Sequence, residues 1–340
     1  MEPLIVAEMT EAYYRALLGI AGSRALPDLR PRSETLCAHA DSTEDLYTDL
    51  DRLHDAYLTA VAHPGSAGAR HATALLAELP PHPEHGRAPL TAFVVDWRHQ
   101  LRPVAVARAG TGHAEHVRAR MLWDLACARQ GNVRNPWKAA WDGVWRDLRP
   151  LVGAAVDLER LAPYSRAYFT GTLLRAYNRE VNGAGAETIA KLIALIDAGI
   201  VDLGHSMNAR EAFAEQTTPA GGSHTVVPVH RVVPGWVLRP AEIVHRDPLY
   251  ARLVADGHLE LGAPELGTPY LRLDHGFHPR QASTSWRAVT ILGVPAEGFV
   301  FFQLALARPH APNAALMAVE RWARGLAAAV GPGSTCAHPR

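Results

Sequence analysis

Apolar side chains recur every three or four residues through most of the N-terminal part of the chain, which predicts amphipathic helices. The predicted helices cover residues 4–20, 41–62, 69–79, 112–128, 136–150, 164–179 and 186–198. Gly19 and Gly199 favour helix ends because glycine adopts the backbone conformation that closes a helix. Pro150 predicts the end of the helix over 136–150, since proline lacks the backbone donor.

After about residue 222 the pattern changes to short apolar runs with many β-branched residues. Residues 224–233 and 287–292 are predicted strands, while the run 299–306 fits either a strand or a helix. Helices are predicted over 247–255 and 313–330. The expected fold class is therefore α+β or α/β, with a mostly helical N-terminal region and a smaller C-terminal sheet-and-helix part.

The same pattern predicts the domain organisation. Residues 1–215 form a helical substrate-type region with a Pro-rich loop near 63–90. Residues 222–330 form a smaller α/β part, and the Gly- and Pro-rich residues 331–340 are expected to be a flexible tail.

Composition excludes several classes of protein. The chain has 340 residues, of which 48% are hydrophobic, and 34 basic side chains balance 34 acidic ones. This neutral, apolar composition is typical of a folded protein and argues against a nucleic-acid binder. No membrane span and no signal peptide are expected, because no apolar run reaches about 18 residues and the N-terminus lacks basic residues. We expect a cytoplasmic protein.

The zero net charge conceals two oppositely charged segments. Residues 1–60 contain eleven Asp or Glu and five Arg, a net charge of −6. Residues 86–150 contain eleven Arg or Lys and five Asp or Glu, a net charge of +6. Either helices from these segments pair with each other, or the asymmetry indicates a partner surface or an anionic ligand.

No metal site is predicted. Three groups of histidine with acidic residues occur in the sequence: His82-Glu84-His85, His113-Glu115-His116 and Asp274-His275-His278. Their spacings match no standard zinc arrangement, so solvated surface histidines are the favoured interpretation.

One helix presents a stripe of aromatic residues. Trp137, Trp141 and Trp145 are four residues apart, and basic residues that include Lys138 surround them. An aromatic stripe at this spacing is typical of a helix face packed in the core. Aromatic and basic residues together also suit an anionic aromatic ligand, so both interpretations stay open.

Four stretches of the chain resemble one known family. They are GNVRNPWKAAWDGVWRDLR at 131–149, ETIAKLIALIDAGIVDLG at 187–204, GVPAEGFVFFQLALARP at 293–309, and MTEAYYRALLG near the N-terminus. These stretches resemble the actinobacterial FAD/NAD(P)-binding protein family, whose members are flavoprotein-like oxidoreductases. The resemblance covers roughly residues 4–330, and it matches the second half of those longer proteins.

The resemblance implies a function shared between two chains. Members of that family begin with a Rossmann-type domain that holds FAD, and the present chain resembles the part after that domain. We therefore expect the substrate-domain subunit of a split flavin-dependent oxidoreductase with a role in biosynthesis. It would form a heterodimer with a separate FAD-binding Rossmann protein, bind FAD only together with that partner, and act on a small-molecule substrate.

The resemblance also implies site residues. The residues expected near the cofactor are Gly293, Val294, Pro295, Glu297, Gly298 and Arg308. The candidates for lining the substrate pocket are Tyr13, Tyr14, Trp137, Lys138 and Tyr168.

A different hypothesis is that the chain descends from such enzymes but uses no cofactor. It would then be a small-molecule binding or scaffold protein, or an enzyme with side-chain acid/base chemistry. The acid/base candidates are His205, His230 and Glu297.

Overall fold

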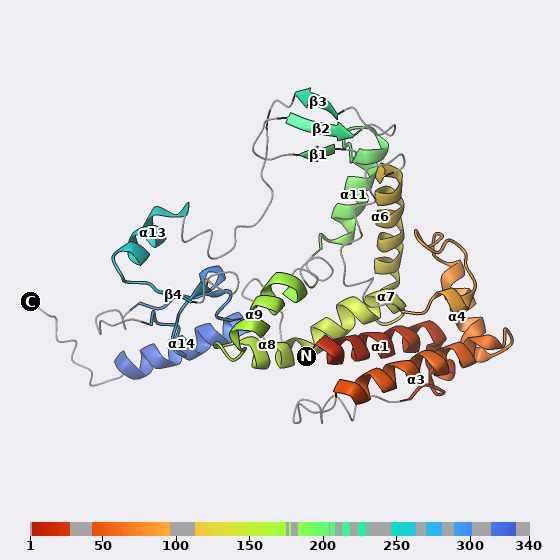
Figure 1. The fold of residues 1–340 in the computed structure, drawn as a ribbon, viewed down its shortest axis with the longest axis horizontal. Coiled ribbons are helices and arrows are strands. Elements are labelled where there is room, and N and C mark those ends of the chain that lie inside the picture. The colour runs from red at the N-terminus through yellow and green to blue at the C-terminus, as the bar shows by residue number, and fades with distance from the viewer. Residues whose placement is uncertain are drawn as a thin grey trace, which may run out of the picture. The chain divides into compact units, whose positions relative to one another are not determined.

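The computed structural model describes residues 2–27, 43–95, 113–174, 177, 183–203, 205–207, 213–217, 224–228, 231, 246–262, 270–280, 289–300 and 314–330. These residues form a mostly helical α+β fold, as the sequence predicts (Figure 1). The chain consists of two compact units. Residues 1–148 and 176–234 form the first unit, and residues 149–175 and 235–340 form the second. This division places residues 149–175 with the C-terminal part, unlike the division drawn from the sequence.

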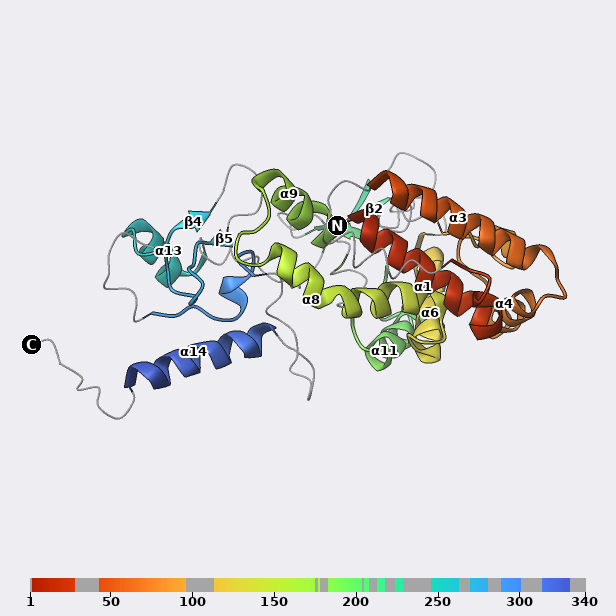
Figure 2. The ribbon, with the colours of Figure 1, turned by 90° about the horizontal axis from the view of Figure 1, so that it is seen from below.

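The first unit begins with helices α1 (Glu2–Ser23), α3 (Thr43–Ala62) and α4 (Ala67–Ala77). Helix α1 packs along both α3 and α4 (Figure 2). On α3 the side chains of Leu50, Leu53, Tyr57 and Val61 are buried, which confirms the helix face predicted from the spacing.

Two glycines determine how α1 ends and how closely it approaches α4. Gly19 has φ 68° and kinks α1, but the helix continues to Ser23 instead of stopping there. At Gly22 an added Cβ would lie 2.6 Å from the Cα of Gly68 in α4. Because a Cβ cannot fit at this distance, the contact between α1 and α4 requires glycine.

A second group of helices comprises α6 (His113–Gln130), α7 (Pro136–Lys138), a π-helical segment (Ala139–Gly143) and α8 (Val144–Val156). Asn135 is the N-cap of α7, and its Oδ1 accepts the backbone N–H of Lys138 at 3.0 Å. The prediction that Pro150 ends this helix is wrong, since α8 continues to Val156. Proline removes one backbone hydrogen bond, and the burial of Val152 and Val156 offsets that loss.

Helix α11 (Ala186–Asp197) packs against α6 in the same unit. Arg118 on α6 forms a bidentate ion pair with Asp197 on α11, at 2.5 and 2.9 Å. Gly199 comes after the helix with φ 69°, which confirms the predicted helix end.

A three-stranded antiparallel sheet completes the first unit. Its strands are β1 (His205–Met207), β2 (Phe213–Thr217) and β3 (His224–Pro228), in that order. In the register, Glu215 of β2 lies opposite Ser206 and Val226. The strands therefore begin before residue 222, earlier than the sequence predicts. The segment HSM of β1 and the segment FAEQT of β2 are short and largely polar, so their composition carries no strand signal.

The second unit contains α9 (Pro163–Tyr168), a π-helical segment (Phe169–Leu173), α13 (Pro248–Ala255), the hairpin of β4 (Leu261–Gly262) and β5 (Tyr270–Leu271), and α14 (Ala314–Val330). Its core consists of Leu259, Tyr270, Leu271, Leu273, Phe277, Ile291, Ala296, Phe299 and Val300. Asp247 is the N-cap of α13 and accepts the backbone N–H of Leu249 at 2.9 Å, and the helix that it begins confirms the one predicted over 247–255.

One strand predicted in this unit is wrong over its described part. Residues 289–292 lie outside any strand. The backbone N–H of Ile291 bonds to the Phe277 carbonyl at 2.9 Å, and the Ile291 side chain joins the core. In this β-branched run, Ile291 therefore packs in the core although its segment has no regular secondary structure. Most of the run 299–306 lies outside the described residues.

Candidate functional site

A pocket with a volume of about 260 Å³ lies in the first unit, between the end of α4, the Pro-rich loop after it, and α6. Its lining includes Leu76, Pro80, His82, Arg87, Phe93 and Trp123. The predicted Pro-rich loop therefore forms one wall of a concave site.

Aromatic rings in edge-to-face contact build the wall of this pocket. The Trp123 ring lies 4.7 Å from the His82 ring, with an interplanar angle of 75°. It lies at the same distance from Trp137, with an angle of 81°. His82 also stacks on His85 at 4.7 Å and contacts Phe93 at 6.0 Å. Edge-to-face contacts of this kind stabilise the packing of the rings against one another.

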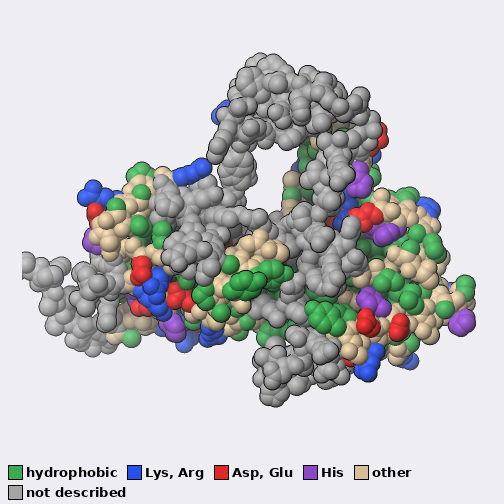
Figure 3. Space-filling model, in the orientation of Figure 1, with side chains coloured by type: hydrophobic (Ala, Val, Ile, Leu, Met, Phe, Trp, Pro, Cys, Tyr) green, Lys and Arg blue, Asp and Glu red, His purple; other side chains and the backbone are tan. Residues whose placement is uncertain are grey.

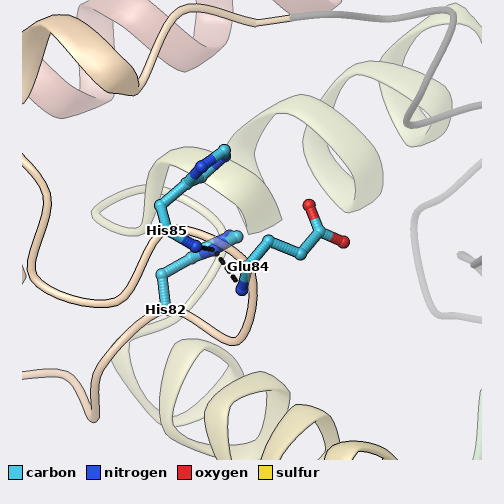
Figure 4. Close-up of side chains that lie close together, drawn as sticks. All are labelled: His82, Glu84 and His85. Atoms are coloured by element: carbon cyan, nitrogen blue, oxygen red, sulfur yellow. Dashed lines mark hydrogen bonds between the residues drawn. The ribbon is translucent and has the colours of Figure 1, made fainter. Parts of the chain in front are cut away.

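The His82 side chain holds the loop in a tight turn. Its Nδ1 accepts the backbone N–H groups of Glu84 and His85, both at 3.2 Å (Figure 4). The backbones of His82 and Gly86 also pair, at 3.0 and 2.7 Å. Nδ1 thus plays the part that an asparagine oxygen plays in an Asx turn. This hydrogen bonding assigns the tautomer with the proton on Nε2.

His82 is neutral in the folded chain. Burial, aided by the nearby His85 and Arg120, lowers the pKa of His82 to about 4. The sequence interpretation of surface histidines is wrong for this residue, because only 8% of His82 is exposed. The Pro-rich loop folds back on Trp123, and that packing excludes water.

His82, Glu84 and His85 also bring three potential metal ligand atoms within 4.8 Å of one another. However, the lone pair of His82 Nδ1 already accepts two backbone N–H groups. The Glu84 carboxylate lies 3.8 Å from Arg120. The cluster therefore stabilises the turn, and binding of a metal by these side chains would require the loss of these contacts.

Three predicted substrate residues lie behind the pocket wall and are buried. Tyr13 meets Trp137 edge to face at 5.5 Å, and Tyr14 stacks on Tyr57 at 4.3 Å. The Tyr14 hydroxyl lies 2.5 Å from His54 Nδ1 and accepts the Val95 N–H. Tyr13, Tyr14 and Trp137 thus lie next to one another, and none of the three is among the residues that line the pocket.

The other two predicted substrate residues have different surroundings. Lys138 Nζ lies 2.8 Å from Asp124 Oδ1, with the lysine side chain 15% exposed. Burial acts to lower the pKa of Lys138, but the Asp124 carboxylate outweighs it and the pKa is raised. Lys138 is thus a charged partner of α6. Tyr168 lies on α9 in the second unit and is partly exposed.

The predicted cofactor turn lies in the second unit and is tightly hydrogen-bonded. Gly293 has φ 80° and Gly298 has φ 94°, conformations that favour glycine. The Ala296 N–H bonds to the Gly293 carbonyl at 2.9 Å, and the Gly298 N–H bonds to the Val300 carbonyl at 3.2 Å. Ala296 and Phe299 are fully buried.

These bonds bear on the expected flavin contact. The N–H groups of Ala296 and Gly298 would have to leave their carbonyls to reach a flavin oxygen. The turn around Val294, Pro295 and Glu297 therefore does not fit a flavin held by those donors. The structure places His205 on β1. Arg308 and His230 lie outside the described residues.

An arginine-rich cluster surrounds this turn, and no sequence motif indicates it. Arg166 on α9 donates to the Gly298 carbonyl, and its Cζ lies 4.5 Å from the centre of the Tyr270 ring. The Tyr270 hydroxyl donates to Glu159 at 2.9 Å. Glu159 also pairs with Arg280 at 3.2 Å and with Arg272 at 3.7 Å.

Basic side chains of the segment 86–150 pair outside the segment 1–60. Arg134 pairs with Glu78, Arg120 with Glu84, and Arg118 with Asp197. On the face shown in Figure 3, acidic and basic side chains of the described residues lie interspersed. None of these three ion pairs joins the segment 86–150 to the segment 1–60.

Comparison with protein-family models and with curated proteins finds no match for this chain. Among the described helices, none has the length and apolar character needed to cross a bilayer.

Proposed function

We propose that the chain binds a small planar aromatic molecule with an anionic substituent in the pocket of the first unit. The observation that carries this proposal is a pocket of about 260 Å³ walled by Trp123, Phe93 and a neutral His82. Ring faces and edges of this kind favour a flat apolar ligand. The volume suits a compound of about one or two fused rings.

A charged side chain at the pocket indicates which polar group the ligand carries. Arg87 lines the pocket and is exposed to solvent. Since burial keeps His82 neutral, Arg87 is the charged group among the lining residues. A guanidinium at the mouth of an apolar pocket favours a carboxylate on the ligand.

A matched pair of ligands tests this proposal. We expect 2-naphthoate to quench the tryptophan fluorescence of the full chain in a saturable way, and to bind more tightly than 2-naphthylmethanol. Arg87→Gln should weaken naphthoate binding about three- to tenfold and leave the alcohol unchanged, because only the acid meets the guanidinium. Equal effects on both ligands would contradict the role of Arg87.

Two variants test the location of the site. Thr73→Trp places a large ring on an exposed lining position of α4 and should block binding without disturbing the core. Trp123→Leu should weaken binding about tenfold or more by removing an aromatic wall. The matched control is Trp322→Leu, at a half-exposed position on α14 of the second unit. Naphthoate binding that survives Thr73→Trp would place the ligand elsewhere.

We further propose that the chain works as the substrate-domain subunit of a split flavin-dependent oxidoreductase. The family-like stretches at 131–149 and 293–309 support this proposal. So does α14, where Met317, Val319 and Leu326 are between 41 and 51% exposed. Apolar side chains exposed along one helix suit contact with a second chain. The Rossmann domain of the partner would then supply most contacts to FAD, since the Ala296 and Gly298 N–H groups bond to carbonyls of this chain.

Co-expression tests the two-chain proposal. The probe is a protein encoded next to this chain that begins with a strand, a GxGxxG loop and a helix. We expect a yellow complex that co-purifies and shows a flavin absorption spectrum, while each chain purified alone is colourless. A neighbour that purifies with FAD but does not bind this chain would contradict the proposal.

A further inference from the structure

The side chain of Arg166, in the second unit, is buried and carries a nitrogen without a hydrogen-bond partner. Arg166 is 6% exposed, and its Nη2 atom is buried without an acceptor. The other terminal nitrogen, Nη1, donates to the Gly298 carbonyl, and the guanidinium covers the Tyr270 ring. A buried, charged donor left unpaired is costly, so such a group requires an explanation, and a bound ion or ligand is one that fits a guanidinium.

The carboxylates near Arg166 already have partners. Glu159 accepts the Tyr270 hydroxyl and pairs with Arg272 and Arg280. Glu260 pairs with Arg272 at 2.7 Å. The guanidinium groups of Arg272 and Arg280 thus pair with the carboxylates of Glu159 and Glu260. Arg166 contacts the Gly298 carbonyl and the Tyr270 ring instead.

We infer that this cluster binds an oxyanion, the carboxylate or phosphate group of a small ligand, with Arg166 Nη2 as the donor. If Arg166 only held the turn in place, a single N–H donor to the Gly298 carbonyl would be enough, and several other side chains can supply one. Arginine presents a second nitrogen in a fixed plane, the geometry that recognises carboxylate and phosphate oxygens. The Tyr270 ring holds that plane in place. The inference concerns the second unit and does not rest on the aromatic pocket.

The test measures thermal unfolding of the full chain in increasing inorganic phosphate or sodium acetate, with ionic strength held constant by chloride. We expect a saturable rise in the melting temperature of the wild type, since a ligand that binds only the folded state stabilises it. A response to phosphate alone assigns a phosphate group, and a response to acetate assigns a carboxylate.

Variants locate the effect. Arg166→Met should abolish the anion dependence, whichever way its melting temperature moves without anion. Arg166→Lys keeps the charge but loses the fork, and should bind about tenfold more weakly. If Arg166→Met fails to fold, the test relies on Arg166→Lys. The matched control is Arg324→Met, at an exposed position paired with Glu320 on α14.

Two results would overturn the inference. One is a wild type whose melting temperature shows no saturable response to either anion. The other is a response that persists unchanged in both Arg166 variants. In either case Arg166 only fastens the turn at Gly298.

Discussion

The pocket of the first unit and the arginine cluster of the second solve the problem of buried polar groups in opposite ways. Around the pocket, His82 Nδ1 accepts two backbone N–H groups, and Asn135 bonds through both its amide oxygen and its amide nitrogen. In the second unit, Arg166 keeps a buried donor without an acceptor. The first site is aromatic, with one charged side chain, Arg87, among its lining residues, whereas the second is rich in arginine and keeps one donor unpaired.

This contrast determines which ligands each site is able to attract. A cavity walled by rings binds mainly by burying apolar surface, and the exposed Arg87 adds a preference for a carboxylate on the ligand. A buried guanidinium selects by charge and by hydrogen-bond geometry. The two units therefore differ in the group that contributes most to binding, a planar ring in the first and an oxyanion in the second.

The largest effect should come from deleting one buried ring in each unit. Trp123→Ala and Phe299→Ala each remove a side chain that is at most 2% exposed. We expect each to lower the free energy of unfolding by about 3–5 kcal/mol, measured by chemical denaturation. Naphthoate binding should be lost only with Trp123→Ala, because the pocket lining belongs to the first unit. If Phe299→Ala also abolished binding, the comparison of two separate sites would fail.

The next effect concerns acid stability. His82 has a pKa of about 4 in the folded chain, below the usual value of 6.5, because burial disfavours its charged form. The unfolded chain takes up the proton first, so stability falls as pH drops from 6.5 towards 4. The loss should approach about 3 kcal/mol, measured as the free energy of unfolding against pH.

Two His82 variants separate the turn from the titration. His82→Asn supplies an oxygen where Nδ1 stood, so it should keep the turn but lose this pH dependence. His82→Ala loses both, and should be less stable than the asparagine variant at pH 7. An unaltered pH profile in His82→Asn would assign the acid sensitivity to another group.

A smaller effect is expected at the N-cap behind the pocket. Asn135 is fully buried, and its Oδ1 accepts the Lys138 N–H at 3.0 Å. Asn135→Ala should cost about 1–2 kcal/mol in the free energy of unfolding. Asn135→Asp keeps the acceptor and should cost less, although it loses the donor to Gln130. Equal losses would indicate that the amide donor, and not the cap, is what matters.

The smallest effect should come from the ion pair on α14. Arg324 and Glu320 are 80 and 60% exposed. Glu320→Gln should change the free energy of unfolding by less than about 0.5 kcal/mol, because water screens exposed pairs. Its anion-dependent melting should match the wild type. A change in anion response would mean that surface charge in general, and not Arg166, controls that response.

Much of the helical architecture could be predicted from the sequence. The buried face of α3, the cap at Asp247 and the helix end at Gly199 all depend on residues within one or two turns. The predicted helix end at Pro150 was wrong. It rested on proline's missing backbone donor alone and did not include the burial of Val152 and Val156, which follow it in the helix.

The sites were less predictable. Trp137 could be singled out from its helical stripe, yet Trp123 and His82, which line the pocket, were missed. The spacing of His82 from its two N–H donors resembles an Asx turn, and that signal could have found the buried turn. The segment 293–298, predicted to contact a cofactor, is a turn whose Ala296 and Gly298 N–H groups bond to backbone carbonyls of the same chain.

Local sequence was enough to define where most helices begin and end, and which of their faces are apolar, because hydrogen bonds and caps act between near neighbours. Which side chains meet depended on the tertiary structure alone. His82 reaches Trp123 across 41 positions, and Arg166 reaches Gly298 across 132. Burial then lowered the pKa of His82 and left Arg166 Nη2 without a partner. Burial and charge at these sites arise from packing between distant segments, which no local pattern encodes.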